Sequence, residues 1–349
     1  MARMSGKQFD RSIARAYRRR FGREPAAPGG EAPATDPQSR REEIAELAQA
    51  VAEEHGLVRR GDALRSRAGR VEPDAIASAA GISLSFGPYG DAFDGMLEYG
   101  AGVARRDDRR DACRTVSPGR FHIYANLDRL TRPDSPRARF TLAHELGHYY
   151  IDEHRLALAS GRAPAHASRS EYESPNAAEQ EADHFAAHLL MPPERFLSRA
   201  RAAPPGLAGV LELAEALGVS LTAAAVQYAS LDVRPCAVVK WDWRGFSWKH
   251  LSTSAFRAFF RRTFESPADL AEGSPTRLAL ARKSPPECGY FQAGTVASAW
   301  FPGIEPGQWR DAIFLEQAIP LGRFGVLTFL HPEGGARALP ARRKTSSGR

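Results

Sequence analysis

Along the first 200 residues, apolar positions follow helical spacing at both ends and strand spacing in between. A helical stripe runs from Ser39, a predicted N-cap, to His55, and a second short helix is predicted to end at Gly81. Three following segments have the short apolar pattern of strands: 82–86, 93–97 and 121–124. Helical spacing then returns in two longer segments: 139–151 and 177–190. This order predicts a small sheet followed by two strong helices.

The second half of the chain changes pattern twice. Residues 207–229 predict two helices joined at Gly218, and the pair resembles a helix-turn-helix unit. The second helix offers only Gln227 to read base edges, so we favour a packing or repressor-docking role over DNA binding. From Cys236 onward the pattern is that of strands with one helix among them, at 254–264. This change predicts a separate α+β domain of about 100 residues.

These patterns predict an α+β fold in several parts. A small sheet with two strong helices occupies residues 39–200, a helix-turn-helix-like segment occupies 201–233, and an α+β domain occupies 234–332. The N-terminal extension with its Pro/Gly/Ala-rich linker, 1–38, has no core pattern, and neither has the C-terminal tail, 333–349. Both basic ends are therefore predicted to be disordered.

The predicted helix at 139–151 contains His144-Glu145-Leu146-Gly147-His148, an H-E-x-x-H pattern. Residues four apart lie on one face of a helix, so both imidazoles leave from the same side and can bind one ion. Neutral imidazole is a good ligand for zinc, and Glu145 is placed to take a proton from the attacking water. A chain of this composition should contain roughly 0.03 such matches by chance. The sequence therefore predicts a zinc site with His144 and His148 as ligands and Glu145 as the catalytic residue.

A catalytic zinc needs a third protein ligand, and the sequence offers two candidates. His154 has the spacing of an H-E-x-x-H-x-x-G-x-x-H pattern, but Ile151 stands where that pattern needs glycine for its turn. Glu179 lies on the second strong helix, and Asp183 shares its face one turn later, whereas Glu181 points elsewhere. We predict that Glu179 is the third ligand and that Asp183 accepts the second N–H of a ligating imidazole. His154 is then expected to be a polar residue at a fraying helix end. A small sheet in front of the metal helix would also let its edge strand bind an extended peptide.

The net charge of +7 is carried by the two ends of the chain. Residues 1–23 contain eight Lys or Arg and one acid, and residues 336–349 contain five and none, which leaves residues 24–335 at −5. Contact with DNA through the basic ends should therefore be weak and non-specific. Three widely spaced cysteines without a C-x-x-C argue against a cysteine metal site. With no long apolar run and no signal-like start, we expect a cytoplasmic protein without membrane contact.

The segment RFTLAHELGHYYI, followed by a match to ExEADxFAAxLLMP, resembles the ImmA/IrrE family of bacterial metallopeptidases. The pair Glu179 and Asp183 after H-E-x-x-H is also the gluzincin pattern, and FDGML and FHIYANLD fit the preceding strands of the family. The resemblance covers about residues 70–230 and implies a zincin-like peptidase domain. An arginine-rich insertion, 105–119, and the basic N-terminal extension depart from the family pattern.

That resemblance implies a zinc-dependent endopeptidase that cleaves a helix-turn-helix (XRE-like) repressor and so switches on stress, DNA-damage or mobile-element genes. The matched positions are His144, His148 and Glu179 for the metal and Glu145 for catalysis. By the same analogy, the last domain is expected to be a GAF-like sensor or docking module. Its aromatic side chains would line a ligand pocket or, more commonly, form a core: Trp241, Trp243, Trp248, Trp300 and Phe301. Two other functions stay open: a non-catalytic protein that binds a repressor, and a DNA-binding regulator.

Overall fold

The computed structural model describes seven segments of the chain: 36–55, 70–100, 120–161, 166–168, 176–252, 270–300 and 313–333. Four predicted features fall outside them: the basic extension, the arginine-rich insertion, the helix at 254–264 and the basic tail. The weak DNA contact that we expect from the two basic ends therefore stays a prediction.

The chain divides into two compact units. The first contains residues up to Pro192 together with Ala216–Val219, and the second contains Pro193–Glu215 and the residues from Ser220 onward. Helices and a sheet occur in each unit, so the predicted α+β class is confirmed. This division assigns most of the helix-turn-helix-like segment to the second unit. The predicted borders between the parts 39–200, 201–233 and 234–332 stay a prediction.

The first unit contains a four-stranded sheet in the order β1-β3-β2-β4. Its strands are β1 (Ser83–Gly87), β2 (Gly95–Tyr99), β3 (Phe121–Asn126) and β4 (His166–Ser168). β1 runs parallel to β3, and β2 runs antiparallel to both β3 and β4. Leu97 and Ile123 pair across the two central strands and are fully buried, because this face of the sheet is covered by helices. β4 is a strand that the sequence pattern did not predict.

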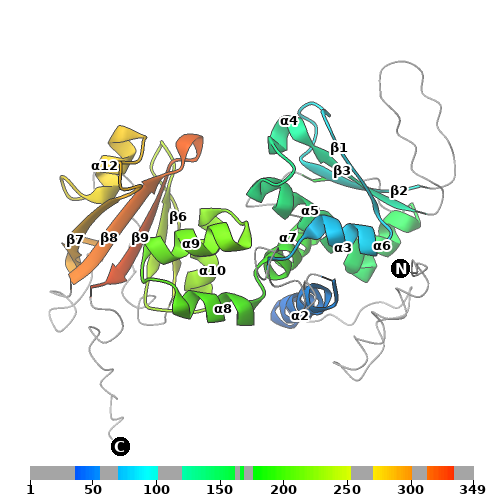
Figure 1. The fold of residues 1–349 in the computed structure, drawn as a ribbon, viewed down its shortest axis with the longest axis horizontal. Helices are drawn as coiled ribbons and strands as arrows, with labels where there is room; N and C mark the ends of the chain where they lie inside the picture. The colour runs from blue at the N-terminus through cyan, green and yellow to red at the C-terminus, as the bar shows by residue number, and fades with distance from the viewer. Residues whose placement is uncertain are drawn as a thin grey trace, which may run out of the picture. The chain divides into compact units, whose positions relative to one another are not determined.

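The helices of the first unit are stacked on its sheet in successive layers (Figure 1). They are α2 (Pro37–His55), α3 (Pro73–Ala79), α4 (Leu127–Leu130), α5 (Pro136–Tyr150), α6 (Asp152–Ala159) and α7 (Ala177–Leu190). α5 packs on β2 and β3, α7 packs on α5, and α2 packs on α7. α2 begins two residues before the predicted N-cap Ser39, since proline suits the first turn of a helix.

The two ends of α5 differ from their predicted positions. The side chain of Ser135 accepts a hydrogen bond from the backbone N–H of Ala138, and Pro136 occupies the first turn, so α5 starts one turn before residue 139. Ile151 leaves the helical conformation with φ −76° and ψ 111°, and α6 begins at the next residue. His154 therefore lies within a second helix, and its predicted place at a fraying helix end was wrong.

The second unit contains a five-stranded antiparallel sheet in the order β6-β5-β9-β8-β7. Its strands are β5 (Ala237–Trp241), β6 (Phe246–Leu251), β7 (Phe291–Val296), β8 (Ile313–Pro320) and β9 (Val326–Pro332). Its helices are α8 (Pro193–Ala202), α9 (Leu207–Leu217), α10 (Leu221–Ser230), α12 (Pro275–Arg282) and α13 (Ala297–Trp300), with a short 3₁₀ turn η2 (Gly322–Phe324). The last residues of α9 belong to the first unit.

α10 and α12 cover opposite faces of this second sheet. The ring of Tyr228 on α10 lies 5.7 Å from the ring of Phe329, whereas the hydroxyl of Thr276 at α12 lies 2.7 Å from that of Thr328. Neighbouring residues of a strand point to opposite faces, so the two helices lie on different sides of β9. Gln227, the one base-reading side chain predicted on α10, is buried. This burial agrees with a packing role for α10.

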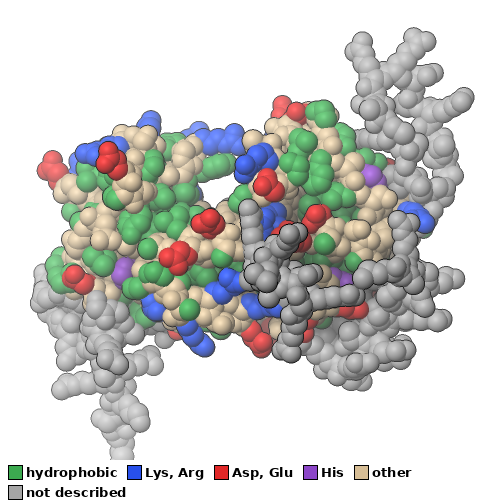
Figure 2. Space-filling view, in the orientation of Figure 1, with side chains coloured by type: hydrophobic (Ala, Val, Ile, Leu, Met, Phe, Trp, Pro, Cys, Tyr) green, Lys and Arg blue, Asp and Glu red, His purple; other side chains and the backbone are tan. Residues whose placement is uncertain are grey.

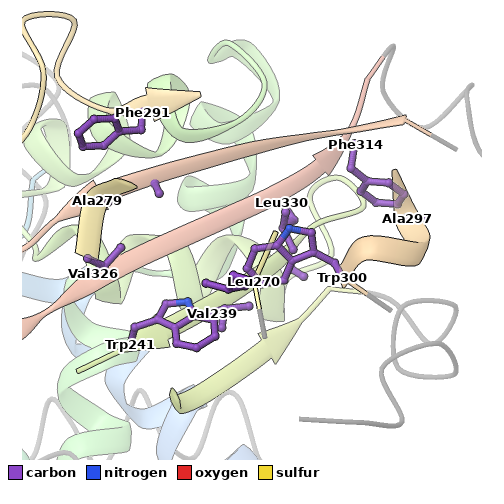
Figure 3. Close-up of a cluster of buried hydrophobic side chains, with 12 residues drawn as sticks. Val239, Trp241, Leu270, Ala279, Phe291, Ala297, Trp300, Phe314, Val326 and Leu330 are labelled. Carbon is purple, nitrogen blue, oxygen red and sulfur yellow. The ribbon is translucent and has the colours of Figure 1, made fainter. Parts of the chain in front are cut away.

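A core of the second unit combines aliphatic side chains with four aromatic ones, Trp241, Phe291, Trp300 and Phe314 (Figure 3). Trp241 and Trp300 are almost fully buried, their ring centroids lie 6.4 Å apart, and Trp300 donates its indole N–H to Glu316. The structure therefore supports core packing as the role of Trp241 and Trp300. Trp243 is partly exposed, and Phe301 lies outside the described residues. The GAF-like form of this domain stays a prediction.

Among the described helices, none alone is both long and apolar enough to cross a membrane. α9 and α10 pass the same test of length and composition only as a pair, and that pair is bent by 113°. An angle of this size is typical of the two helices of a helix-turn-helix unit.

Replacement of Trp241 by alanine should destabilise the second unit strongly. The ring is fully buried in the core of the second unit, and removal of a buried aromatic side chain costs about 3–5 kcal/mol. Urea denaturation followed by circular dichroism should show an earlier transition for Trp241→Ala than for the control Trp243→Ala, because Trp243 is partly exposed. Equal shifts in the two variants would contradict the assignment of Trp241 to the core.

Candidate metal centre

α5 places its histidines and glutamate at buried positions beneath the sheet. His144, Glu145 and His148 are each at most 3% exposed. The rings of His144 and His148 lie one helical turn apart, and their Nε2 atoms face each other at 3.1 Å. Both histidines therefore present the same ring nitrogen to one point, as a shared metal ion would require.

α7 approaches α5 very closely at the glycine of the H-E-L-G-H segment. A Cβ atom on Gly147 would lie 3.1–3.3 Å from the atoms of Ala182, which is tighter than ordinary van der Waals contact. The absence of a side chain at Gly147 thus lets the two helix backbones meet. Glu179, less than one turn before Ala182 on α7, is brought to the two histidines by this contact.

Glu179 completes a cluster of three possible metal ligands. One of its carboxylate oxygens lies 3.0 Å from Nε2 of His148, and the other lies 3.4 Å from Nε2 of His144. Two ligands at about 2.1 Å from one ion, with a tetrahedral angle between them, lie about 3.4 Å apart. The three separations therefore fit a four-coordinate ion, with the fourth position left to water or substrate. Two imidazoles and one carboxylate are also a donor set that suits zinc.

The second nitrogen of each imidazole is held by another side chain. Nδ1 of His144 lies 2.7 Å from Oδ1 of Asp183, so this carboxylate accepts the N–H that a zinc-binding tautomer carries. Nδ1 of His148 lies 3.2 Å from Nδ1 of His154. The structure thus brings Asp183 to the predicted partner, and it places His154 behind His148, on the side away from the cluster.

Glu145 lies between the histidines and the start of β2. A Cβ atom added to Gly95 would come within 2.8 Å of Oε1 of Glu145, so the glutamate packs directly on the strand backbone. Gly95 pairs with Ser168 of β4, which means that β2 is covered on both sides. Among the described strands, the open edge next to β2 therefore belongs to β4. An extended peptide that pairs next to β2 would therefore have to use β4, because β3 separates β2 from the other edge strand, β1.

Two buried polar side chains fix the loop that leads to Gly95. The amide of Asn126 donates to the carbonyl groups of Gly90 and Phe93, and the carboxylate of Asp94 accepts from Arg129 and Arg137 at 2.5 and 2.6 Å. Arg137 lies in the first turn of α5, so Asp94 joins the strand to the helix that carries Glu145. These roles were not predicted from the sequence. The local signal was a polar residue among apolar ones near one end of a predicted strand: Asp94 near the start of 93–97, and Asn126 just after 121–124.

Without an ion, the surroundings of the two histidines shift their pKa values in opposite directions. Burial alone would lower the pKa of His144, but hydrogen bonds to Asp183 and Glu179 and the charge of Glu145 raise it to about 10. Burial lowers the pKa of His148 to about 4, and its hydrogen bond to Glu179 acts in the opposite direction. Without an ion, a proton on His144 therefore compensates part of the negative charge of the surrounding carboxylates.

The site lies within a region that resembles known proteins. Residues 131–228 match the family model of the IrrE N-terminal-like domain, a family of peptidases. Among solved structures, the chain is similar to a Mycobacterium tuberculosis transcriptional regulator, with 14% identity, a TM-score of 0.44, and coverage of 84% of this chain and 77% of that one. A TM-score of that size does not establish a shared fold. No curated protein sequence matches the chain.

Zinc affinity should fall as the pH falls. With the pKa of His144 at about 10, an ion that binds at neutral pH must displace one proton, so the apparent affinity should drop about tenfold per pH unit. His148, with a pKa of about 4, should contribute nothing above about pH 5. Competition with a chelator of known affinity at pH 6, 7 and 8 measures the slope. An affinity independent of pH would show that His144 is already neutral in the ion-free site.

Replacement of Gly147 by valine should push α5 and α7 apart and weaken zinc binding. Overpacking of a close contact costs about 1–3 kcal/mol in stability, and here it would also move Glu179 away from the histidines. Bound zinc per chain after gel filtration and the free energy of unfolding are the two measurements. Gly294→Ala is the control, since its added Cβ would meet only a contact at 3.8 Å. A Gly147→Val variant with the full zinc content would contradict the role of this contact.

Proposed function

We propose, from the match of residues 131–228 to the IrrE N-terminal-like family model, that the chain is a zinc-dependent endopeptidase that cleaves a helix-turn-helix transcriptional repressor. The observation that carries the proposal is the buried cluster of His144, His148 and Glu179 next to Glu145. Ion-binding side chains beside a buried carboxylate, on a zincin-like helical scaffold, are the parts that peptide hydrolysis needs.

Each residue of the site has a separate task in this proposal. His144, His148 and Glu179 would hold the zinc, and Asp183 would fix the tautomer of His144. When bound there, zinc would polarise the scissile carbonyl group and make the attacking water more acidic. Glu145 takes the proton of that water as the peptide carbon is attacked, and it returns the proton to the leaving amine.

The surroundings of Glu145 support this acid–base role. The carboxylate is fully buried and lies against the backbone at Gly95, where a side chain would collide with it. Its position is therefore set by packing, and little reorientation is needed before it accepts a proton. Bulk water is excluded from the same place, which strengthens the electrostatic interactions of the reacting groups.

The proposal that the substrate is a repressor rests on the family resemblance and on two observations that disfavour direct binding to DNA. Acidic and basic side chains of the described residues are interspersed on the face drawn in Figure 2. Gln227, the base-reading side chain of α10, is buried. A chain of this kind would act on transcription more readily through a protein substrate than through the bases of DNA.

Replacement of Glu145 by glutamine should abolish cleavage and leave zinc binding intact. Glutamine has the same shape but accepts no proton, so catalysis should fall by about 10²–10⁴-fold while the ligands remain in place. Candidate repressors encoded near the gene are incubated with the full chain and zinc, and new fragments are detected on a gel. The control Glu153→Gln changes a half-exposed glutamate on α6 and should cleave normally.

Two outcomes of this experiment separate the peptidase from a non-catalytic protein that binds a repressor, and a third tests the role of Glu145. Cleavage by the wild-type chain and none by Glu145→Gln supports the peptidase. Tight binding of a repressor by both chains without new fragments would replace the peptidase by a non-catalytic binding protein. Cleavage by Glu145→Gln at the wild-type rate would show that Glu145 is not the general base.

A further inference from the structure

His154 and Glu181 were set aside as ligands, yet the structure places His154 in contact with the predicted ligand His148, and Glu181 in contact with His154. Nδ1 of His148 and Nδ1 of His154 lie 3.2 Å apart, and Nε2 of His154 lies 3.2 Å from Oε2 of Glu181. The side chain of His154 is only 11% exposed, so its ring nitrogens contact these two side chains rather than bulk water. His154 lies in the first turn of α6, which begins directly after the break in the helix at Ile151.

The hydrogen-bond pattern permits one arrangement of protons when an ion is bound. An imidazole that binds a metal through Nε2 carries its proton on Nδ1, so His148 must donate to His154. The Nδ1 of His154 then has no proton, and its own N–H lies on Nε2, where it points to the carboxylate of Glu181. Each donor in this series therefore meets an acceptor.

Arg40 on α2 holds the far end of the series. Its Nε and Nη2 atoms each donate to one carboxylate oxygen of Glu181 at 3.0 Å, which is a bidentate pair. The carboxylate of Glu181 thus accepts two hydrogen bonds from Arg40, and it also faces the Nε2 atom of His154. Arg40 also donates to Glu153 at 3.0 Å, a contact that does not involve His154.

We propose that Arg40, Glu181 and His154 form a hydrogen-bonded relay that fixes the ring orientation and tautomer of His148, so that α2 contributes to metal affinity. The three are positioning residues, because none of them touches the ion or the substrate. This inference rests on the proposed function to the extent that the site binds zinc. It gives His148 the support that Asp183 gives His144 by a single direct hydrogen bond.

The relay differs in one respect from an ordinary set of ion pairs between helices. Arg40, Glu181 and Glu153 alone would join α2, α7 and α6 and would contribute only to stability. Because His154 lies between Glu181 and the ligand His148, the charged groups of Glu181 and Arg40 also influence the affinity of the site for the metal. The two roles are separable, because Glu153 shares Arg40 and is absent from the series that leads to His148.

The experiment measures zinc affinity on the full chain, by competition with a chromophoric chelator after removal of metal. His154→Leu removes the acceptor for His148 and should weaken zinc binding about 10- to 100-fold. His154→Gln restores an acceptor oxygen and an N–H donor and should recover most of that loss. Glu181→Leu removes the anion behind His154 and should weaken binding in the same direction. Glu153→Gln is the matched control and should bind zinc like the wild type.

The unfolding of each ion-free variant is measured in parallel, and Glu181→Leu decides the matter if His154→Leu does not fold. Wild-type affinity in His154→Leu or, in that event, in Glu181→Leu would overturn the relay. A loss in Glu153→Gln equal to that in Glu181→Leu would also overturn it, since the effect would then follow from helix packing alone. If the wild-type chain binds no zinc, the proposed function itself fails, whereas equal tight binding by all variants removes only the relay.

Discussion

The metal centre depends on how closely α5 and α7 approach each other at Gly147. The two candidate histidine ligands and the proposed catalytic glutamate lie on a single helix, on which His144 and His148 are one turn apart. The proposed third ligand comes from another helix, and its distance is set by the contact between Gly147 and the backbone of Ala182. A side chain at that point would separate the helices by more than the tolerance of a metal–ligand bond. The packing of two helices thus decides whether the site can bind an ion.

Burial then determines how the ligands are supported. Histidines that are almost fully buried cannot rely on water to hold their second N–H, so each needs a partner from the protein. His144 has an anion, Asp183, in direct contact, and His148 has the imidazole of His154, which itself contacts the anion Glu181. This asymmetry agrees with the opposite directions of the pKa shifts of His144 and His148 in the ion-free site.

Local spacing was enough to predict the parts of the site that lie on one helix. The H-E-x-x-H pattern placed Glu145 and both histidines, and the four-residue spacing on α7 placed Asp183 one turn after Glu179. Contacts between distant segments had no such signal. The spacing of apolar residues shows which face of a helix or strand is buried, but not which other element packs on that face. Arg40 and Glu181, for example, are 141 residues apart. In the second unit, alternation predicted strands, but neither their order nor the burial of α10 followed from it.

The turn between α9 and α10 shows why a helix-turn-helix-like pattern does not imply DNA binding here. Arg139 of α5 is buried and donates from Nε to the carbonyl oxygen of Gly218 at 3.0 Å. Gly218 has a φ of 64°, and a side chain there would collide with the guanidinium group of Arg70. A buried guanidinium needs acceptors for its N–H groups, so this carbonyl group forms part of the anchor of the metal-binding helix. A base-reading α10 would have to expose Gln227, which is buried. These two observations favour a packing role for the turn and for the Gln227 side of α10.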